Sequence, residues 1–410
     1  MSTSASTDTR HERIGSRDDG PQMTTPQSVT SASPLHHAVV IAQCVHGLGI
    51  GGAQQVIRYI IGCGDRARYR HVVYTPNDGV LRKDIEAGGA LVRVIPRHVP
   101  KFDPAWVIRL MRAMRDDGVE LVHTHLFGDS LHGYLAARLA GIPVVMTLHS
   151  VAHNFSPLQL SGYRWLIRSV DKAIACSPSS YATFSQAMGN GDQLSTIANG
   201  LSAAAIPKPG VEEVKRARTA LAIPDGAMVV GAIGRLVEAK GYTHLIGALS
   251  TVRKAFGSVR LVFVGEGPLR AELEDQARRQ DVADAVIFTG YRNDTATLLN
   301  LFDVVVFSSL REGIPLALLE ALAIGKCVVS TAVPSLIDVL TEETALLVPA
   351  RDPEALGGAI ARVLDDPELR RNLGAAGQRR FFEAFTAEEM TKKYEAVYAE
   401  LLAARRRSRN

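Results

Sequence analysis

The sequence predicts an α/β protein of two doubly wound parallel-sheet domains that face each other across a cleft. Its 410 residues exceed what a single hydrophobic core usually holds, so two domains are expected. From residue 38 onward, short apolar runs alternate with amphipathic segments, as is typical of parallel strands covered by helices. The alternation breaks in a Pro- and Ala-rich segment near 202–215 and then restarts, which separates the two domains.

The first series contains seven predicted strands. They are AVVIAQC (38–44), HVVYT (71–75), LVRVI (91–95), LVHTH (121–125), VVMTLH (144–149), KAIAC (172–176) and LSTIA (194–198). The segments between them have helical spacing and Gly or Pro punctuation. Because ligands of doubly wound sheets bind at the carboxyl ends of the strands, we expect a site between the domains.

The second series contains six predicted strands and ends in one long helix. The strands are MVVGAIG (228–234), LVFVG (261–265), VIFTG (286–290), DVVVF (303–307), CVVS (327–330) and ALLVP (345–349). The final helix runs from about Thr386 to Ala404, with Tyr394, Tyr398 and Leu402 on its apolar stripe. We therefore predict a disordered leader over 1–35, domains over 36–205 and 206–385, and a helix that crosses back, with a basic tail, over 386–410.

Composition narrows the class of protein. The net charge, 46 − 42 = +4, is too mild to indicate a nucleic-acid partner. Four scattered cysteines without a CxxC pair indicate reduced thiols in a cytoplasmic protein. The leader is rich in Ser, Thr and Asp and lacks the apolar stretch of a signal peptide. The arginines at 405, 406, 407 and 409 suit contact with anionic lipid at the inner membrane face, or are simply a solvated end.

Two carboxylates stand out in SSLREGIPLALLEA (308–321), where Glu312 and Glu320 are eight positions apart. A β-branched strand precedes them, and Pro315 suits the start of a helix that Gly325 ends. The helix N-terminus between the two glutamates is a natural anion site. Two acceptors of hydroxyl hydrogen bonds around a phosphate site suit a nucleotide sugar, although both glutamates would also fit a solvated surface.

Three blocks of the second half, GRLVEAKG (234–241), VGEGPLR (264–270) and SSLREGIPLALLEALA (308–323), resemble the retaining family 4 glycosyltransferases of the GT-B fold. The order and spacing of the blocks match as well. The resemblance implies two Rossmann-like domains and transfer of a sugar from a nucleotide diphosphate sugar, such as a UDP-sugar or a GDP-sugar. It implies a glycan or lipid-linked acceptor in surface polysaccharide assembly, with no metal or other cofactor.

The resemblance also implies roles for individual residues. The cationic pair Arg235 and Lys240 would grip the donor diphosphate, as paired charges suit that group. Glu312 would contact the sugar, and Glu320 the ribose. The residues expected to bind the donor through the backbone, or to shape the edge of the base pocket, are Gly313, Ile314 and Gly267.

In the first half, HGLGIGGAQQ (46–55) follows the first strand. Gly51 and Gly52 would let the backbone approach a phosphate before a helix opens. No acidic residue stands at the end of the next strand, which disfavours a nicotinamide dinucleotide. Relatives usually carry a glutamate at Gln54 and an acidic residue near Ser335, so the roles of those acids are open.

Three histidines end neighbouring predicted strands, His123 and His125 on one and His149 on the next. The resemblance places His149 near the reacting sugar. A zinc site is disfavoured because no acidic partner is adjacent, and satisfied loop histidines remain the alternative. Two other functions stay open: a different enzyme of the same fold, such as a sugar-nucleotide epimerase or a phosphorylase, and a non-catalytic nucleotide-sugar-binding subunit.

Overall fold

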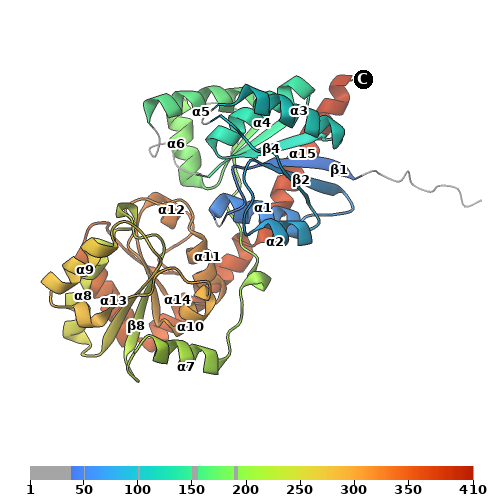
Figure 1. The fold of residues 1–410 in the computed structure, drawn as a ribbon. Coiled ribbons are helices and arrows are strands. Elements are labelled where there is room, and N and C mark those ends of the chain that lie inside the picture. The colour runs from blue at the N-terminus through green and yellow to red at the C-terminus, as the bar shows by residue number, and fades with distance from the viewer. Residues whose placement is uncertain (1–37, 50, 100–101, 150–155, 189–192, 410) are drawn as a thin grey trace, which may run out of the picture. The chain divides into compact units, whose positions relative to one another are not determined.

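A computed structural model describes residues 38–49, 51–99, 102–149, 156–188 and 193–409, with the side chains of the last two described positions left out. The leader predicted over 1–35 lies outside the described residues. Figure 1 shows the ribbon, with two sheets that each carry helices on both faces.

The first sheet has seven parallel strands in the order β3-β2-β1-β4-β5-β6-β7. Its strands are β1 Val39–Cys44, β2 Tyr69–Thr75, β3 Leu91–Val94, β4 Leu121–His125, β5 Val144–Leu148, β6 Lys172–Ala175 and β7 Leu194–Thr196. Its helices are α1 Gly52–Cys63, α2 Arg82–Ala87, α3 Pro104–Asp116, α4 Phe127–Ala140, α5 Pro157–Ser169 and α6 Pro178–Met188. The strand order reverses between β1 and β4, so the carboxyl ends of these two strands flank the expected binding crevice.

The second sheet has six parallel strands in the order β10-β9-β8-β11-β12-β13. They are β8 Met228–Ile233, β9 Val259–Val264, β10 Val286–Phe288, β11 Val304–Phe307, β12 Val328–Thr331 and β13 Leu346–Val348. The helices are α7 Val211–Ala220, α8 Tyr242–Ala255, α9 Arg270–Arg279, α10 Thr295–Leu301, α11 Leu316–Ala323, α12 Pro334–Ile337, α13 Pro353–Asp365 and α14 Pro367–Ala384. Its switch point lies between β8 and β11.

The two doubly wound parallel sheets confirm the predicted fold class. Every predicted strand is present, and the differences are confined to the ends. β2 begins at Tyr69 rather than at the predicted His71, because Tyr69 already pairs with Val39 of β1. The strand ends depend on such ladder partners, which the apolar pattern of one segment does not contain.

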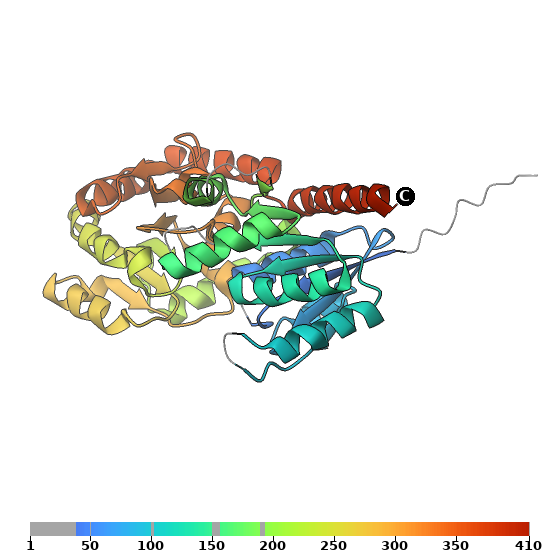
Figure 2. The ribbon, with the colours of Figure 1, turned by 90° about the horizontal axis from the view of Figure 1, so that it is seen from above.

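The last helix, α15 (Ala387–Arg409), lies beside the strands of the first sheet, as Figures 1 and 2 show. Tyr394 and Tyr398 are fully buried, and the Tyr398 hydroxyl oxygen lies 2.7 Å from Nδ1 of His123 in β4. A parallel bridge between Leu201 and Thr386 leads the chain into this helix. Helix α15, which follows the second domain in the sequence, therefore completes the core of the first sheet.

The helix runs past the predicted end at Ala404, so its last residues are not a free tail. The Arg405 guanidinium donates to the carbonyl oxygens of Glu120 at 3.0 Å and Gly141 at 2.6 Å. Because these bonds anchor Arg405 to the loops before β4 and β5, the expectation that all four arginines are available to lipid is wrong for this residue. Arg406 and Arg407 are exposed.

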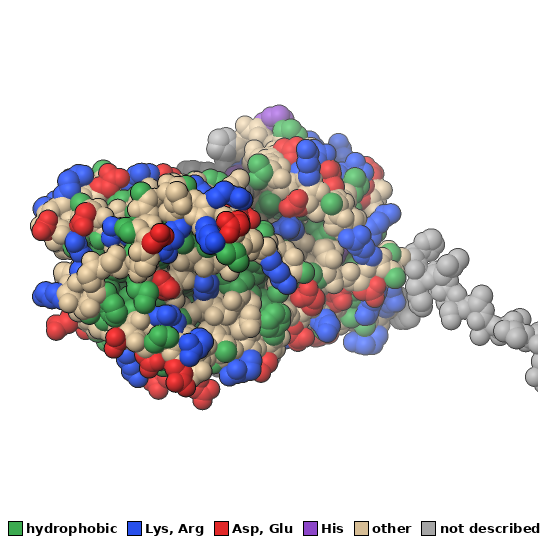
Figure 3. Space-filling view, turned by 90° about the horizontal axis from the view of Figure 1, so that it is seen from below, with side chains coloured by type: hydrophobic (Ala, Val, Ile, Leu, Met, Phe, Trp, Pro, Cys, Tyr) green, Lys and Arg blue, Asp and Glu red, His purple; other side chains and the backbone are tan. Residues whose placement is uncertain are grey.

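On the face shown in Figure 3, acidic and basic side chains are interspersed. This face therefore has no extended patch of positive or negative charge. Trp106 is fully buried in the core of the first sheet, and its indole N–H donates to the carbonyl of Ile95 at 2.7 Å, so it is not available to a membrane. Within the described residues, no helix combines the length and the apolar character that crossing a membrane requires.

Candidate functional site

A cavity of about 960 Å³ lies at the carboxyl ends of both sheets. Its walls include the loops after β1, β4, β5, β6 and β7 of the first sheet and those after β8, β10 and β11 of the second. Every residue predicted for the site, with the exception of Gly267, lines this cavity: Gly51, Gly52, His149, Arg235, Lys240, Glu312, Gly313, Ile314 and Glu320.

Two loops of the second sheet are joined tightly at the cavity. Gly241 has a φ of 61°, and a Cβ there would lie 2.2 Å from the carbonyl oxygen of Ser308, so both space and conformation require glycine. The Ser308 hydroxyl donates to the carbonyl of Lys240 at 2.9 Å, and the Leu310 N–H donates to the carbonyl of Ala239 at 2.8 Å. This contact fixes the loop after β8 against the loop after β11.

The joined loops bring Lys240 and Glu312 together. Their side-chain nitrogen and oxygen lie 2.7 Å apart, and each side chain is 15% exposed. The Ser309 hydroxyl also donates to Oε2 of Glu312 at 3.1 Å. Arg235, in contrast, is exposed, and its guanidinium has no ion-pair or hydrogen-bond partner among the described residues. Of the two predicted cations, Lys240 is therefore neutralised by an ion pair and Arg235 is not.

The loop after β11 leads into α11. Gly313 and Ile314 form part of the wall, and Pro315 is the N-cap with φ −75° and ψ 132°, so the helix begins at Leu316, one residue later than predicted. Glu320 follows on the helix, half-buried at the cavity wall, and burial raises the pKa of its carboxyl to about 7. A helix N-terminus and a carboxyl poised between its two protonation states therefore lie at the same cavity.

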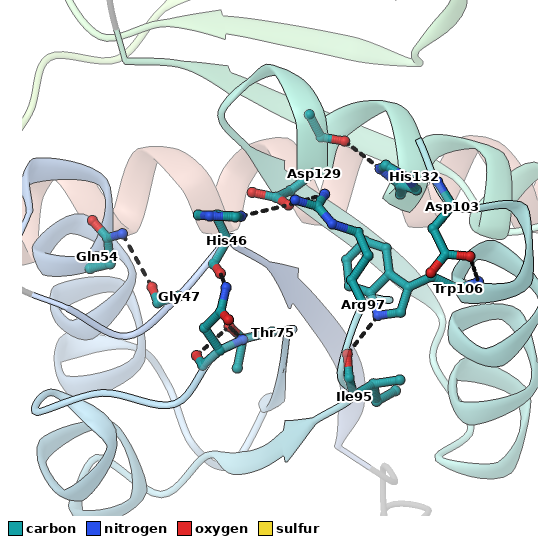
Figure 4. A network of polar contacts seen from close by, with 12 residues as sticks. His46, Gly47, Gln54, Thr75, Ile95, Arg97, Asp103, Trp106, Asp129 and His132 are labelled. Carbon is teal, nitrogen blue, oxygen red and sulfur yellow. Dashed lines mark hydrogen bonds and ion pairs between the residues drawn. The ribbon is translucent and has the colours of Figure 1, made fainter. Parts of the chain in front are cut away.

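The N-terminus of α1 forms the opposite part of the wall. Gly51 is its N-cap, and a Cβ on Gly51 would lie 2.5 Å from Oε1 of Gln54. The side chain of Gln54 folds back over the turn, and its Nε2 donates to the carbonyl of Gly47 at 3.1 Å (Figure 4). Gln54 thus holds the glycine turn.

His149 is the cavity-lining member of the histidine group. Its Nε2 lies 2.9 Å from Nδ1 of the buried His125. His123 is buried beside His125, with ring centroids 4.1 Å apart, and its Nε2 lies 2.7 Å from the hydroxyl of Thr147. Burial lowers the pKa of His149 to about 4 and the pKa values of His123 and His125 well below the usual range. All three rings are therefore neutral near pH 7, and two of them are interior groups rather than loop residues.

Gly267 does not line the cavity. A Cβ at this position would lie 2.4 to 2.7 Å from backbone atoms of Leu236. The glycine therefore lets the loop after β9 pass close to the loop after β8. The structure gives Gly267 a packing role and does not place it with the other predicted residues.

Asn199 belongs to the cavity although the sequence blocks do not include it. It lies after β7 and is 7% exposed. Its Oδ1 is buried and has no hydrogen-bond partner among the described residues. A buried amide oxygen without a partner costs free energy unless a ligand donates to it. A polar residue at the carboxyl end of a predicted strand is the signal that could have found it.

A second polar group, drawn in Figure 4, lies on the first sheet. Nδ1 of His46 lies 3.8 Å and a guanidinium nitrogen of Arg97 3.9 Å from Oδ1 of Asp129, which is buried. Burial raises the pKa of Asp129 to about 6. The adjoining Leu126 lines the cavity with a φ of 66°, a strained conformation for leucine.

Comparison with known proteins identifies this arrangement. Residues 213–380 match the model of glycosyl transferases group 1, and residues 50–204 match that of glycosyltransferase family 4. Together the two matches cover most of the chain. The chain belongs to glycosyltransferase family 4. This assignment shows a glycosyltransferase and confirms the resemblance found in the three sequence blocks.

Individual relatives agree with the family. The 2-deoxystreptamine N-acetyl-D-glucosaminyltransferase of Streptomyces fradiae is 26% identical over 88% of this chain and 94% of its own length. Anabaena HepE, solved in complex with UDP-glucose, superposes with a TM-score of 0.78 at 21% identity, covering 89% of this chain and all of HepE. The sucrose-phosphate synthase of Thermosynechococcus elongatus gives 0.76 at 23% identity, covering 90% of this chain and all of its own. These solved structures confirm the GT-B fold of this family 4 glycosyltransferase.

Proposed function

We propose that this glycosyltransferase moves a sugar from a nucleotide diphosphate sugar to a glycan or lipid-linked acceptor, with retention of configuration. The observation that carries the proposal is the cavity in which Arg235, Lys240, Glu312 and Glu320 meet two helix N-termini. The complex of HepE with UDP-glucose supports a nucleotide sugar as donor.

The diphosphate of the donor is the natural ligand of the cationic part of the cavity. Arg235 has a guanidinium without a partner among the described residues, and the N-termini of α1 and α11 add backbone N–H groups. Negative charge develops on the diphosphate as its bond to the sugar breaks, so fixed cations stabilise the transition state more than the ground state. The chain has no Asp-x-Asp motif, and we assign this charge balance to Arg235 and Lys240 rather than to a metal.

The two glutamates and the wall residues suit the hydroxyl-rich parts of the donor. Glu312, next to Gly313 and Ile314, would accept hydrogen bonds from the sugar, and Glu320 would accept them from the ribose. The unpaired Oδ1 of Asn199 offers another acceptor. The contact of Glu312 with the sugar would distinguish a nucleotide sugar from a nucleotide alone.

The acceptor side faces the first sheet, where His46, Arg97 and Asp129 stand beside the cavity-lining Leu126. In the proposed reaction the acceptor oxygen bonds to the anomeric carbon as the bond to the diphosphate breaks. The acceptor proton leaves with the diphosphate. Attack from the same face through an oxocarbenium-like state needs no carboxylate nucleophile and gives retention.

The end of α15 bears on the acceptor class and on the place of action. Exposed Arg406 and Arg407 support contact with an anionic membrane at its cytoplasmic face. That location would suit lipid-linked acceptors in surface polysaccharide assembly.

Release of nucleoside diphosphate tests the function. The protein is incubated with UDP-glucose, and then with other UDP- and GDP-sugars, with and without a panel of glycan and lipid-linked acceptors. We expect release that rises with one acceptor, and a product whose anomeric configuration, measured by NMR, is that of the donor. Conversion of the donor without release would support an epimerase, and binding without any turnover would support a non-catalytic subunit. An inverted product would overturn retention.

A further inference from the structure

Behind His149 runs a buried chain of hydrogen bonds that reaches the C-terminal helix. Nδ1 of His125 lies 2.9 Å from Nε2 of His149, and Nε2 of His125 lies 2.8 Å from Oε1 of Gln43. The amide nitrogen of Gln43 lies 3.3 Å from Nδ1 of His71 and 3.4 Å from the Tyr398 hydroxyl. Gln43, His125 and Tyr398 are fully buried, so solvent does not compete with these bonds.

The chemistry of Gln43 assigns a direction to the chain. An amide oxygen only accepts, so Nε2 of His125 must carry the proton and donate it. A neutral imidazole has a single N–H, which leaves Nδ1 of His125 as an acceptor. Nε2 of His149 must then donate to it, and Nδ1 of His149 keeps its lone pair. Burial, which lowers the pKa values of both rings, supports their neutral state.

The other end of the network fits the same direction. The amide N–H groups of Gln43 donate to His71 and Tyr398, and Tyr398 then donates to Nδ1 of His123 at 2.7 Å. Nε2 of His123 donates to the Thr147 hydroxyl at 2.7 Å. A rotated Gln43 amide would reverse every one of these bonds and place the proton on Nδ1 of His149. The amide orientation therefore decides what His149 offers to the cavity.

We propose that Gln43 and His125 are positioning residues that hold His149 as its Nε2–H tautomer, so that Nδ1 accepts a hydrogen bond from a ligand hydroxyl. His149 lines the cavity, and Nδ1 has no partner among the described residues. The identity of the ligand as a sugar rests on the proposed function. The tautomer does not, because it is a property of the ligand-free protein.

The proposed tautomer determines which chemical group of a ligand can bind to His149. A hydroxyl donates to the lone pair of Nδ1, whereas a carboxylate or carbonyl presents only lone pairs and is repelled. The sugar at this point therefore carries a free hydroxyl, and a uronate carboxylate would be excluded there.

Histidine-selective ¹⁵N labelling of the full-length, ligand-free protein tests the tautomer directly by NMR. The chain has 12 histidines, and the signals absent from a His149→Gln variant identify His149. We expect a protonated Nε2 and an unprotonated Nδ1. A proton on Nδ1, or exchange between the two tautomers, would overturn the proposal without bearing on whether the protein is a glycosyltransferase.

Two variants test the positioning role. Gln43→Leu removes the acceptor that fixes His125, so we expect His149 to exchange between tautomers. Tyr394→Phe is the matched control, because Tyr394 is equally buried and bonds Thr147 at 3.1 Å, outside the path from Gln43 to His149. It should leave the tautomer unchanged. A single Nε2–H tautomer in a folded Gln43→Leu protein would contradict the role of Gln43, and if that variant does not fold, the wild-type spectrum still decides the proposal.

Donor analogues give a readout at the ligand. UDP-glucose is compared with analogues in which each sugar hydroxyl is replaced in turn by hydrogen or by fluorine, which accepts but does not donate. At one position both replacements should weaken binding about fivefold to tenfold in the wild type and have no effect in His149→Ala. Full binding of that fluoro analogue would show that His149 donates. Failure of every UDP-glucose compound to bind would count against the proposed donor, while the NMR result on the tautomer would stand.

Discussion

The ammonium nitrogen of Lys240 lies 2.7 Å from Oε2 of Glu312, and the residues that would meet the diphosphate and the sugar therefore neutralise each other in the ligand-free protein. A donor that enters the cavity competes with Glu312 for this cation. Each of the two side chains is largely buried, and the ion pair ensures that neither charge is buried without a partner. This coupling separates the effects expected for the two cations.

Replacement of either cation should reduce turnover by about two to three orders of magnitude, since a lost contact to developing charge is worth roughly 3–4 kcal/mol. Stability should differ. Arg235→Ala should leave the melting temperature unchanged, whereas Lys240→Ala leaves Glu312 unpaired and should lower stability by about 1–3 kcal/mol. Thermal melts and release of nucleoside diphosphate measure both. The double variant Lys240→Ala with Glu312→Gln should regain stability but not activity, and recovery of activity would contradict the assignment.

Donor affinity should rise with pH through the titration of Glu320. Its pKa is raised to about 7, so its carboxyl is mostly protonated at pH 6 and mostly ionised at pH 8. Ribose hydroxyls donate more strongly to the ionised form. We expect affinity for a nucleotide diphosphate sugar, measured by calorimetry, to increase about tenfold across this range. Glu320→Gln should bind more weakly at pH 8 and show no such dependence, and an unchanged pH profile would remove Glu320 from the ribose site.

The two glutamates should also differ in what they affect. Glu320→Gln should chiefly weaken inhibition by free nucleoside diphosphate, because the ribose contact exists before and during the reaction. Glu312→Gln should chiefly lower turnover, because the sugar gains charge in the transition state. Inhibition constants and turnover numbers for both variants provide the comparison. Equal changes in the inhibition constant would contradict this division.

Acid should destabilise the first sheet. The pKa values of His71 and His149 are lowered to about 4, so the unfolded chain takes up protons below pH 6.5 that the folded protein does not. Their stabilising contribution is complete above pH 6.5 and is lost as the pH falls toward 4. Each contributes a slope of up to about 1.4 kcal/mol per pH unit. Urea unfolding between pH 4 and 8 measures it, and a flat profile below pH 6.5 would show that these rings are not buried as neutral groups.

Membrane contact should depend on Arg406 and Arg407 and not on Arg405. Two exposed charges contribute about 2 kcal/mol near an anionic surface. Full-length protein should therefore pellet with anionic vesicles at low salt and dissociate as salt screens charges beyond roughly 8 Å. The Arg406→Gln, Arg407→Gln double variant should stay in the supernatant. Arg405→Gln should instead lower stability, and equal pelleting of all three proteins would exclude the helix end as the contact.

The sequence predicts those features that are carried by one segment at a time. The run before Glu312 marks a buried strand, and the position of Glu312 at its carboxyl end places it in the cavity. Its ion pair with Lys240 depends on how two distant loops pack around Gly241, which no local pattern contains. Gly267 lies outside the cavity lining and packs closely against Leu236, so its part in the base pocket stays a prediction.

The buried network of hydrogen bonds around Gln43 could not be predicted from the sequence either. Gln43 lies within an apolar run and gives no periodic signal, and its partners come from β2, β4 and α15. Charge alone predicts lipid contact for the arginines at the chain end. Arg405 is anchored because backbone carbonyls of two loops lie beside the helix, a tertiary relationship that composition cannot show.

The position of α15 has a consequence for biosynthesis on the ribosome. The β-strands that carry His123 and Gln43 are made early, but the tyrosine that bonds both belongs to a helix that spans Ala387–Arg409. A nascent chain therefore holds these polar groups without their partner until α15 has been synthesised. The N-terminal half expressed alone would remain open at that point and would present a surface that chaperones bind. The last folding step of this sheet must wait until α15 has left the ribosome.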